Sequence, residues 1–425
     1  MMVRMESTKD DRTLPSRPTE PAPHPASGLT VRAVAPWFVV VGLALAAFNL
    51  RPALASIGPL LPEIRDGLHM NGAVAGLLTS VPALCFAVFG NAAPRLARRH
   101  GLPAVLVAGL AAVAAGLALR PFAGSTTVFL VTSALALAGV AVGNVLMPVL
   151  VKEYFPDRLG AMTGLYSMAL SLGAACAAGL SVPLARALGD DWRPGLGFWA
   201  IPALVAVLPW LAALRHRRAR ATRIPTPRQE AVPLRLARSG TAWSLAILFG
   251  LQATAAYVTL GWAPQIYQDA GISAGTAGLL AAVIIGLGAP IGFALPPFAA
   301  RLRHQGPLVA VLGVFGLVGY VGLWLAPGGG AWLWAICLGL TNCTFPVVLT
   351  MIGLRARTPH GVARLSAFAQ SIGYLISVPG PLLVGTLNEA TGAWHAPLAL
   401  MVVLLLAQIA VGFRAGRDRC VEDEV

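Results

Sequence analysis

Twelve apolar segments divide this chain, and each reaches or approaches the ~20 residues that a helix needs to cross the hydrocarbon of a bilayer. Only 11% of the residues are charged and 57% are apolar, whereas soluble domains carry about 25% charged residues. A membrane β-barrel would instead show short strands of alternating polarity. The sequence therefore predicts an all-α polytopic membrane protein. The predicted spans are 34–61, 73–94, 102–120, 126–150, 161–187, 195–214, 241–264, 276–299, 307–326, 330–353, 364–387 and 396–414.

Positive charges are distributed unevenly over the predicted loops. The tails and alternate loops, which lie on one side of the membrane, hold every lysine and arginine except Arg51, Arg65, Arg120, Arg186 and Arg193. The positive-inside rule then places both termini in the cytoplasm. We therefore expect a multi-pass protein of the inner (plasma) membrane, and we do not read the net charge of +14 as a sign of nucleic-acid binding.

Two polar stretches separate the chain into parts. Residues 1–32 are polar and proline-rich, which predicts a disordered cytoplasmic tail. Residues 215–240 are rich in arginine and read as a cytoplasmic linker whose basic face rests on anionic lipid headgroups. The linker divides an N-terminal six-helix bundle, 33–214, from a C-terminal one, 241–414, and a short cytoplasmic tail, 415–425, follows.

The two predicted bundles repeat each other. Ala75-Gly76-Leu77-Leu78 returns about 200 residues later as Ala277-Gly278-Leu279-Leu280, and Asn144-x-x-x-Pro148 returns as Asn342-x-x-x-Pro346. Six is an even number of spans, so both copies insert with the same orientation. The sequence therefore predicts two parallel repeats related by an axis along the membrane normal, an arrangement in which substrate sites lie at the midplane between the halves.

The loop after the second span carries a known signature. The stretch Gly90-Asn-Ala-Ala-Pro-Arg-Leu-Ala-Arg-Arg-His-Gly101 resembles the helix 2–3 loop of the major facilitator superfamily, G-x-x-x-D-R-x-G-R-R. Pro94 stands where the family has aspartate and Ala97 where it has glycine, which puts a carboxylate-based latch in doubt. The resemblance implies the major facilitator fold. It also implies a part in conformational gating for Gly90, Arg95, Arg98 and Arg99.

A more specific resemblance covers the first three spans. They are similar to the cyanate/2-nitroimidazole permease family within that superfamily, in four stretches: Asn49–Pro52, Gly58–Leu61, Ala75–Thr79 and Ala93–Arg99. Membership implies a secondary transporter of a small anionic or polar solute, with cyanate-like anions or nitroimidazole-like compounds as substrates. The alternative is a multidrug or xenobiotic exporter of the same fold, which would favour lipophilic cations.

Arg51 lies about halfway along the first apolar segment and is followed by Pro52. An arginine at that depth costs roughly 2.5–3.5 kcal/mol on insertion scales. Because proline has no backbone N–H, an upstream carbonyl also loses its helical partner. This pattern predicts a substrate or gating role for Arg51, as the group that holds an anion. The alternative is a side chain that snorkels to the outer interface.

Other polar residues of the spans could line the same site. Asn49 lies two residues from Arg51, and the alternative for it is a hydrogen bond that packs helices. Asn144 and Asn342 each precede a proline, and their symmetry also fits capping of carbonyls freed by Pro148 and Pro346. In the second half the candidates are Gln252, Tyr257, Gln370 and Tyr374, for which interhelical hydrogen bonds are the alternative.

Several chemistries find no support in the sequence. The five cysteines show no CxxC pairing, so we expect no disulfide, metal site or cofactor. No H-E-x-x-H motif or hydrolase elbow is present, so we expect no enzyme. No Asp, Glu or His lies well inside a span, which favours facilitated diffusion, anion exchange or a proton carried by the substrate. We expect a monomer.

Overall fold

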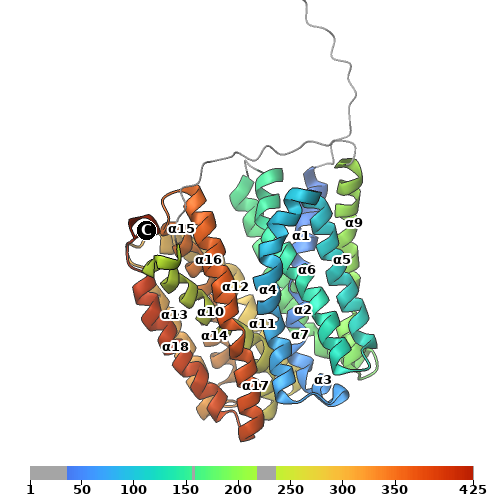
Figure 1. Ribbon diagram of the computed structural model, residues 1–425. Coiled ribbons are helices and arrows are strands. Elements are labelled where there is room, and N and C mark those ends of the chain that lie inside the picture. The colour runs from blue at the N-terminus through green and yellow to red at the C-terminus, as the bar shows by residue number, and fades with distance from the viewer. Residues whose placement is uncertain (1–35, 156–157, 218–235, 425) are drawn as a thin grey trace, which may run out of the picture.

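A computed structural model describes residues 36–155, 158–217 and 236–424, and all the regular structure in these ranges is helical (Figure 1). Twelve helical spans are long and apolar enough to cross a membrane, which confirms the prediction. The predicted tail, 1–32, and most of the predicted linker, 215–240, lie outside the described residues.

The first six spans are built from helices of very different lengths. These are α1 (Pro36–Asn49), α2 (Pro52–Ala55), η1 (Gly58–Leu60) and α3 (Leu61–Leu68), then α4 (Gly72–His100), α5 (Leu102–Leu119), η2 (Arg120–Phe122), α6 (Thr126–Tyr154), α7 (Leu159–Ala187), α8 (Trp192–Gly197) and α9 (Ala200–Arg217). Several helices run beyond the apolar segments, because helix ends that lie outside the hydrocarbon tolerate polar residues. The first span, for example, extends to Leu68, and α4, the helix of the second span, extends to His100.

The last six spans follow the same plan. They are formed by η4 (Leu236–Arg238) and α10 (Gly240–Asp269), α11 (Ala274–Gly286) and α12 (Gly288–Arg301), α13 (Gly306–Leu325), α14 (Ala331–Asn342) and α15 (Thr344–Leu354), α16 (Pro359–Ser377) and α17 (Pro379–Thr391), and α18 (His395–Ala415); η5 (Val421–Asp423) follows. Several spans are therefore divided into shorter helices, the first one at Arg51 and others at Leu287, Cys343 and Val378.

The helices gather into two bundles of six spans. Figure 1 shows the first bundle, coloured blue to green, beside the second, coloured olive to red. Within the first, α5 packs against α6 and α9, and α1 against α7; within the second, α10 packs against α16 and α18. The bundles meet where α4 contacts α16 and α17 and where α7 contacts α11. This is the arrangement of two parallel repeats that the sequence predicts.

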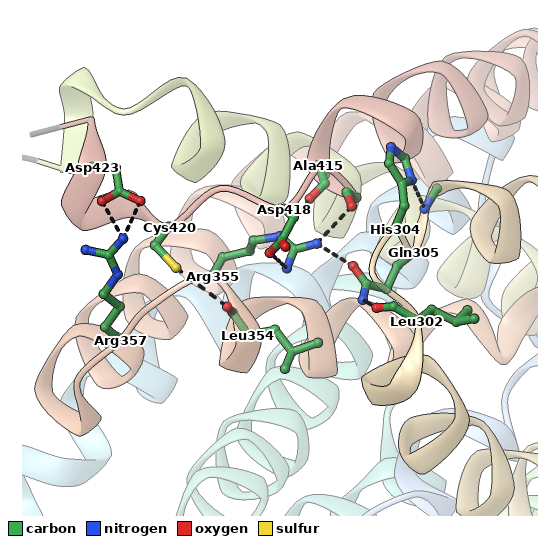
Figure 2. A network of polar contacts seen from close by, with 12 residues as sticks. Leu302, His304, Gln305, Leu354, Arg355, Arg357, Ala415, Asp418, Cys420 and Asp423 are labelled. Atoms are coloured by element: carbon green, nitrogen blue, oxygen red, sulfur yellow. Dashed lines mark hydrogen bonds and ion pairs between the residues drawn. The ribbon is translucent and has the colours of Figure 1, made fainter.

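The chain after α18 folds back onto the second bundle. Arg355 follows α15 and is 2% exposed. Its guanidinium donates to Gln305 Oε1, to the Gly416 carbonyl at 2.9 Å and to the Ala415 carbonyl at 3.4 Å (Figure 2). The last carbonyls of a helix have no intrahelical partner, so Arg355 caps the C-terminus of α18. Asp418 lies 4.0 Å from its Nη1.

Glu424, near the end of the chain, holds the start of α10. Glu424 accepts hydrogen bonds from Ser239 Oγ at 2.6 Å, from the Thr241 amide at 2.9 Å and from Thr241 Oγ1 at 2.7 Å. Burial alone would raise the pKa of Glu424, but these hydrogen bonds hold it below its ordinary value. The segment predicted as a tail at 415–425 is therefore, as far as Glu424, a docked part of the second bundle.

We expect Arg355→Met to lower the melting temperature of the purified protein. The substitution leaves buried acceptors without donors, and each such group costs about 1–3 kcal/mol. The matched control is Arg357→Met, because Arg357 forms an exposed ion pair with Asp423 at 2.7 Å, the two side chains being 60% and 46% exposed. An exposed pair is worth about 0–1 kcal/mol. Equal shifts in the two variants would show that Arg355 does not hold the docked segment.

Candidate functional site between the two bundles

The first span is interrupted at Arg51, the charged residue near its middle. Helix α1 ends at Asn49, α2 begins at Pro52, and Arg51 between them has φ −114° and ψ −29°. The Leu50 amide donates to the Ala47 carbonyl at 3.2 Å, three residues back instead of four. The break predicted from Pro52 is therefore present. Arg51 lies in this break, between two helices in the middle of the span.

Proline at position 52 leaves the Phe48 carbonyl without its usual donor. That carbonyl faces Gly173 on α7, and a Cβ at position 173 would overlap with the Phe48 oxygen. Glycine at this position lets the two spans approach closely, as small residues do in membrane helix packing. The contact fixes the break in the first span against α7, which in turn contacts α11 of the second bundle.

Arg51 lies at the junction of the two bundles. The side chain is half-buried, and its Nε is buried with no hydrogen-bond partner. Its charge interacts with the hydroxyl groups of Tyr257 on α10 and Tyr374 on α16, which both belong to the second bundle. Among the described residues no carboxylate forms an ion pair with it. The role of Arg51 in substrate binding or gating stays a prediction.

Two phenylalanines pack against Tyr374, one of the two tyrosines that interact with Arg51. The hydroxyl groups of Tyr257 and Tyr374 interact with each other as well as with Arg51. Phe86 on α4 stacks on Tyr374 with ring centroids 5.0 Å apart and planes at 19°, so the stack crosses from one bundle to the other. Phe249 meets Tyr374 edge-on at 4.9 Å. The sequence predicted both tyrosines but neither phenylalanine, because apolar aromatic residues in spans carry no distinguishing signal.

The two predicted glutamines are engaged within the second bundle. Gln252 is buried, and its Oε1 accepts a hydrogen bond from Gln408 Nε2 on α18 at 3.0 Å. Gln252 Nε2 is buried without a partner among the described residues. Gln370 donates to Ser366 one turn away on α16, at 2.6 Å. The hydrogen bond of Gln252 joins α10 to α18, and it is the interhelical bond that was the alternative to substrate binding. The hydrogen bond of Gln370 stays within α16.

Two of the three predicted asparagines, Asn49 and Asn144, donate to a carbonyl one turn earlier in their own helix. Asn49 is buried and its Nδ2 donates to the Leu45 carbonyl at 2.8 Å, while its Oδ1 has no partner among the described residues. Asn144 Nδ2 donates to the Val140 carbonyl at 3.0 Å. Asn342 ends α14, and its Oδ1 is buried without a described partner. A role in substrate binding stays a prediction for all three.

The predicted gating residues lie in the second half of α4. Arg95, Arg98 and Arg99 belong to its last turns, and no ion pair involves them among the described residues. A Cβ on Gly90 would meet only Val145 of the same bundle, at 3.7 Å. Their predicted role in gating stays a prediction. Within the described ranges, no group of three or more His, Cys, Asp or Glu could hold a metal ion.

The two bundles are in close contact on the side of the membrane opposite to η5 and the C-terminal end (Figure 1). Glu389 on α17 accepts a hydrogen bond from the Ala73 amide at the start of α4, at 3.1 Å. A Cβ on Gly72 would lie 2.6 Å from the Gly385 carbonyl, and a Cβ on Gly385 would overlap with the Gly72 carbonyl. We call the contact of Gly72 and Ala73 with Gly385 and Glu389 the far-side seal.

The chain resembles known transporters over most of its length. The model of the Major Facilitator Superfamily matches residues 38–381. The "Uncharacterized transporter YycB" of Bacillus subtilis is 36% identical over 93% of this chain and 97% of its own. The Escherichia coli "2-nitroimidazole transporter" is 34% identical, over 90% and 96%. The E. coli "Cyanate transport protein CynX" is 30% identical, over 85% and 95%.

The fold also matches solved structures. A bacterial homologue of the human lysosomal transporter Spinster superposes with a TM-score of 0.71 at 16% identity, covering 92% of this chain and 98% of that one. At such low identity the likeness concerns the arrangement of the helices, and it agrees with a fold of two six-span bundles.

Proposed function

Because this chain belongs to the major facilitator superfamily, we propose that it is a secondary transporter that moves a small anionic or electron-rich solute by alternating access. One observation carries the proposal. The Arg51 guanidinium lies between the bundles, interacts with two tyrosine hydroxyls of the opposite bundle and has no carboxylate partner among the described residues. A half-buried cation without a counter-charge is suited to binding an anion.

The chemistry of the site supports a particular class of solute. The planar guanidinium offers a fork of donors that suits a carboxylate or a linear anion. Tyr257 and Tyr374 add hydroxyl groups, and Phe86 adds an aromatic face. Two relatives are named for cyanate and for 2-nitroimidazole, both of which are small and electron-rich. We therefore propose cyanate-like anions or nitroimidazole-like compounds as substrates.

Alternating access requires two conformations of the bundles. We propose that both termini lie in the cytoplasm, so that the far-side seal faces outward and separates Arg51 from the outer solution. Access to Arg51 from outside then requires the contact of Gly72 and Ala73 with Gly385 and Glu389 to open. The acids of the described spans lie near helix ends, so we propose facilitated diffusion, anion exchange or a proton carried by the substrate.

Replacing Gly385 with alanine should shift the protein toward the outward-open state. The added methyl group overlaps with the Gly72 carbonyl, and such overpacking costs about 1–3 kcal/mol, or roughly 5- to 150-fold in a two-state ratio. Spin labels at Gly124 and Gly328, in loops on that side, should report a longer distance between bundles. Gly286→Ala is the control, because nothing lies within 4 Å of a Cβ there. An unchanged distance distribution in Gly385→Ala would contradict the seal.

Uptake into proteoliposomes tests the proposed function. Labelled cyanate and labelled 2-nitroimidazole should enter liposomes that contain the protein faster than empty ones, with and without a pH gradient. Lipophilic cations should not be transported, because a cavity arginine without a carboxylate repels them. Transport of cationic dyes, with neither cyanate nor 2-nitroimidazole accepted, would support the multidrug exporter instead. Strict dependence on the pH gradient with a neutral substrate would contradict the proposed mode of coupling.

A further inference from the structure

A second arginine of the first bundle is completely buried. Arg120 begins the short helix η2 at the far end of the third span, and its relative exposure is 0%. From the sequence it counts among the few cations of the far side, where a surface position would be ordinary. Among the described residues no carboxylate pairs with it. A buried guanidinium without a counter-charge is costly unless its other contacts compensate.

Those contacts join three spans. Arg120 Nη1 donates to the Ala53 carbonyl at 2.7 Å, and Nε donates to Ser133 Oγ on α6 at 3.0 Å. The guanidinium lies 5.9 Å from the centre of the Phe129 ring. Nη2 is buried and has no partner among the described residues. The bond to Ala53 is the one that reaches the broken first span.

The Ala53 carbonyl has lost its helical donor. In an unbroken helix the amide of Ile57 would bond to it, but this amide donates instead to the Leu54 carbonyl at 3.2 Å. Helix α2 has only four residues, Pro52–Ala55, and directly follows Arg51. So short a helix does not hold its own orientation, because helix formation needs several consecutive turns. Arg120 supplies the missing donor and ties α2 to α5 and α6.

We propose that Arg120 is a positioning residue for the anion site: by holding the Ala53 carbonyl it fixes the four-residue helix that sets the direction of Arg51. Arg120 itself does not touch the solute. The inference rests on the proposed function in so far as Arg51 is the group that binds the anion. The positioning itself can be measured without any substrate.

Hydrogen exchange of the purified protein tests the positioning. In Arg120→Gln, the backbone amides of 54–57 should exchange roughly tenfold faster than in the wild type, because a buried carbonyl has lost its donor. The control is Arg186→Gln, an exposed arginine at the end of α7 on the same side, which should leave this exchange unchanged. Unchanged exchange in Arg120→Gln would overturn the inference, whatever Arg51 does.

Transport kinetics test the consequence for the site. Arg120→Gln should raise the KM for cyanate roughly tenfold while the maximal rate per folded molecule changes less, and Arg120→Lys, which keeps one donor, should recover part of the affinity. Combined with Arg51→Lys, the loss should be less than the product of the single losses. Faster exchange with an unaltered KM would overturn the inference.

Failure of the proposed function and failure of the positioning are distinguishable. If Arg51 variants transport normally, the proposed function has failed, and the positioning of α2 is then judged by hydrogen exchange alone. If Arg120→Gln does not fold, Ser133→Ala takes its place, because it removes the partner of Nε and keeps the charge. That variant should change both the exchange and the KM in the same direction by a smaller factor, and an unchanged exchange would overturn the inference.

Discussion

Replacing Arg51 with lysine should lower the uptake of cyanate roughly 10- to 150-fold while the protein still inserts and folds. Lysine keeps the charge but loses the planar fork, and the hydrogen bonds lost are charge-assisted bonds worth about 1.5–3 kcal/mol. Arg51→Ala should abolish measurable uptake, because the anion then enters a site of low dielectric with no counter-charge. Initial rates of labelled cyanate uptake, normalised to the amount of folded protein, measure both effects.

The control for Arg51 is Arg193→Ala. Arg193 lies on the far side and forms an ion pair with Asp191 at 3.5 Å, with the two side chains 39% and 43% exposed. Exposed pairs contribute little, so this variant should transport at the wild-type rate. If Arg51→Ala transports cyanate like the control, Arg51 is not the anion-binding group and the proposed site is wrong.

Gly173→Ala should both destabilise the protein and remove most of its transport activity. The new Cβ overlaps with the Phe48 carbonyl, so either α7 or the broken first span must move. Overpacking of this kind costs about 1–3 kcal/mol, and the displaced element is the one that carries Arg51. We expect a lower melting temperature and the loss of most cyanate uptake, measured by thermal unfolding and by proteoliposome assay.

The matched substitution is Gly179→Ala on the same helix. There the added Cβ meets Ala282 at 3.5 Å and Leu279 at 3.7 Å, which are ordinary van der Waals distances. This variant should fold and transport normally. If Gly173→Ala unfolds at the same temperature as Gly179→Ala and transports equally well, the contact between α7 and the break in the first span does not hold the site.

The fold could be predicted because bilayer thickness sets the length of each apolar segment. The break at Arg51 could be predicted as well, since Pro52 removes a hydrogen-bond donor. The breaks at Leu287 and Cys343 could not, although each lies three residues before a proline. Pro148 lies inside the unbroken helix α6, so a proline alone does not tell which spans divide.

The docking of the last residues had no signal in the sequence either. Glu424 bonds to Ser239 and Thr241, which lie more than 180 positions earlier in the chain. A short polar segment after the last span looks the same whether it is free or docked. Only the folded second bundle brings the carboxylate to the start of α10.

The site was only partly predictable, because several of its contacts join segments that are far apart in the sequence. Arg51 stands out because a charge in hydrocarbon is costly, and Tyr257 and Tyr374 stand out as polar groups in apolar spans. Phe86 has no such signal and is recognised only from its stack on Tyr374. Arg120 looks like a surface cation in the sequence, because its hydrogen-bond partners come from other spans. Contacts between segments that are distant in the chain cannot be predicted from this sequence alone.

The position of a bound anion tests the central claim most directly. Selenocyanate is a linear anion like cyanate, and its selenium scatters X-rays anomalously, so crystals grown with it reveal the site in an anomalous difference map. We expect one strong peak between the bundles, with the anion in hydrogen-bond contact with the Arg51 guanidinium and beside Tyr257 and Tyr374. A peak elsewhere, with the Arg51 side chain turned toward lipid or paired with a carboxylate, would contradict the proposed site.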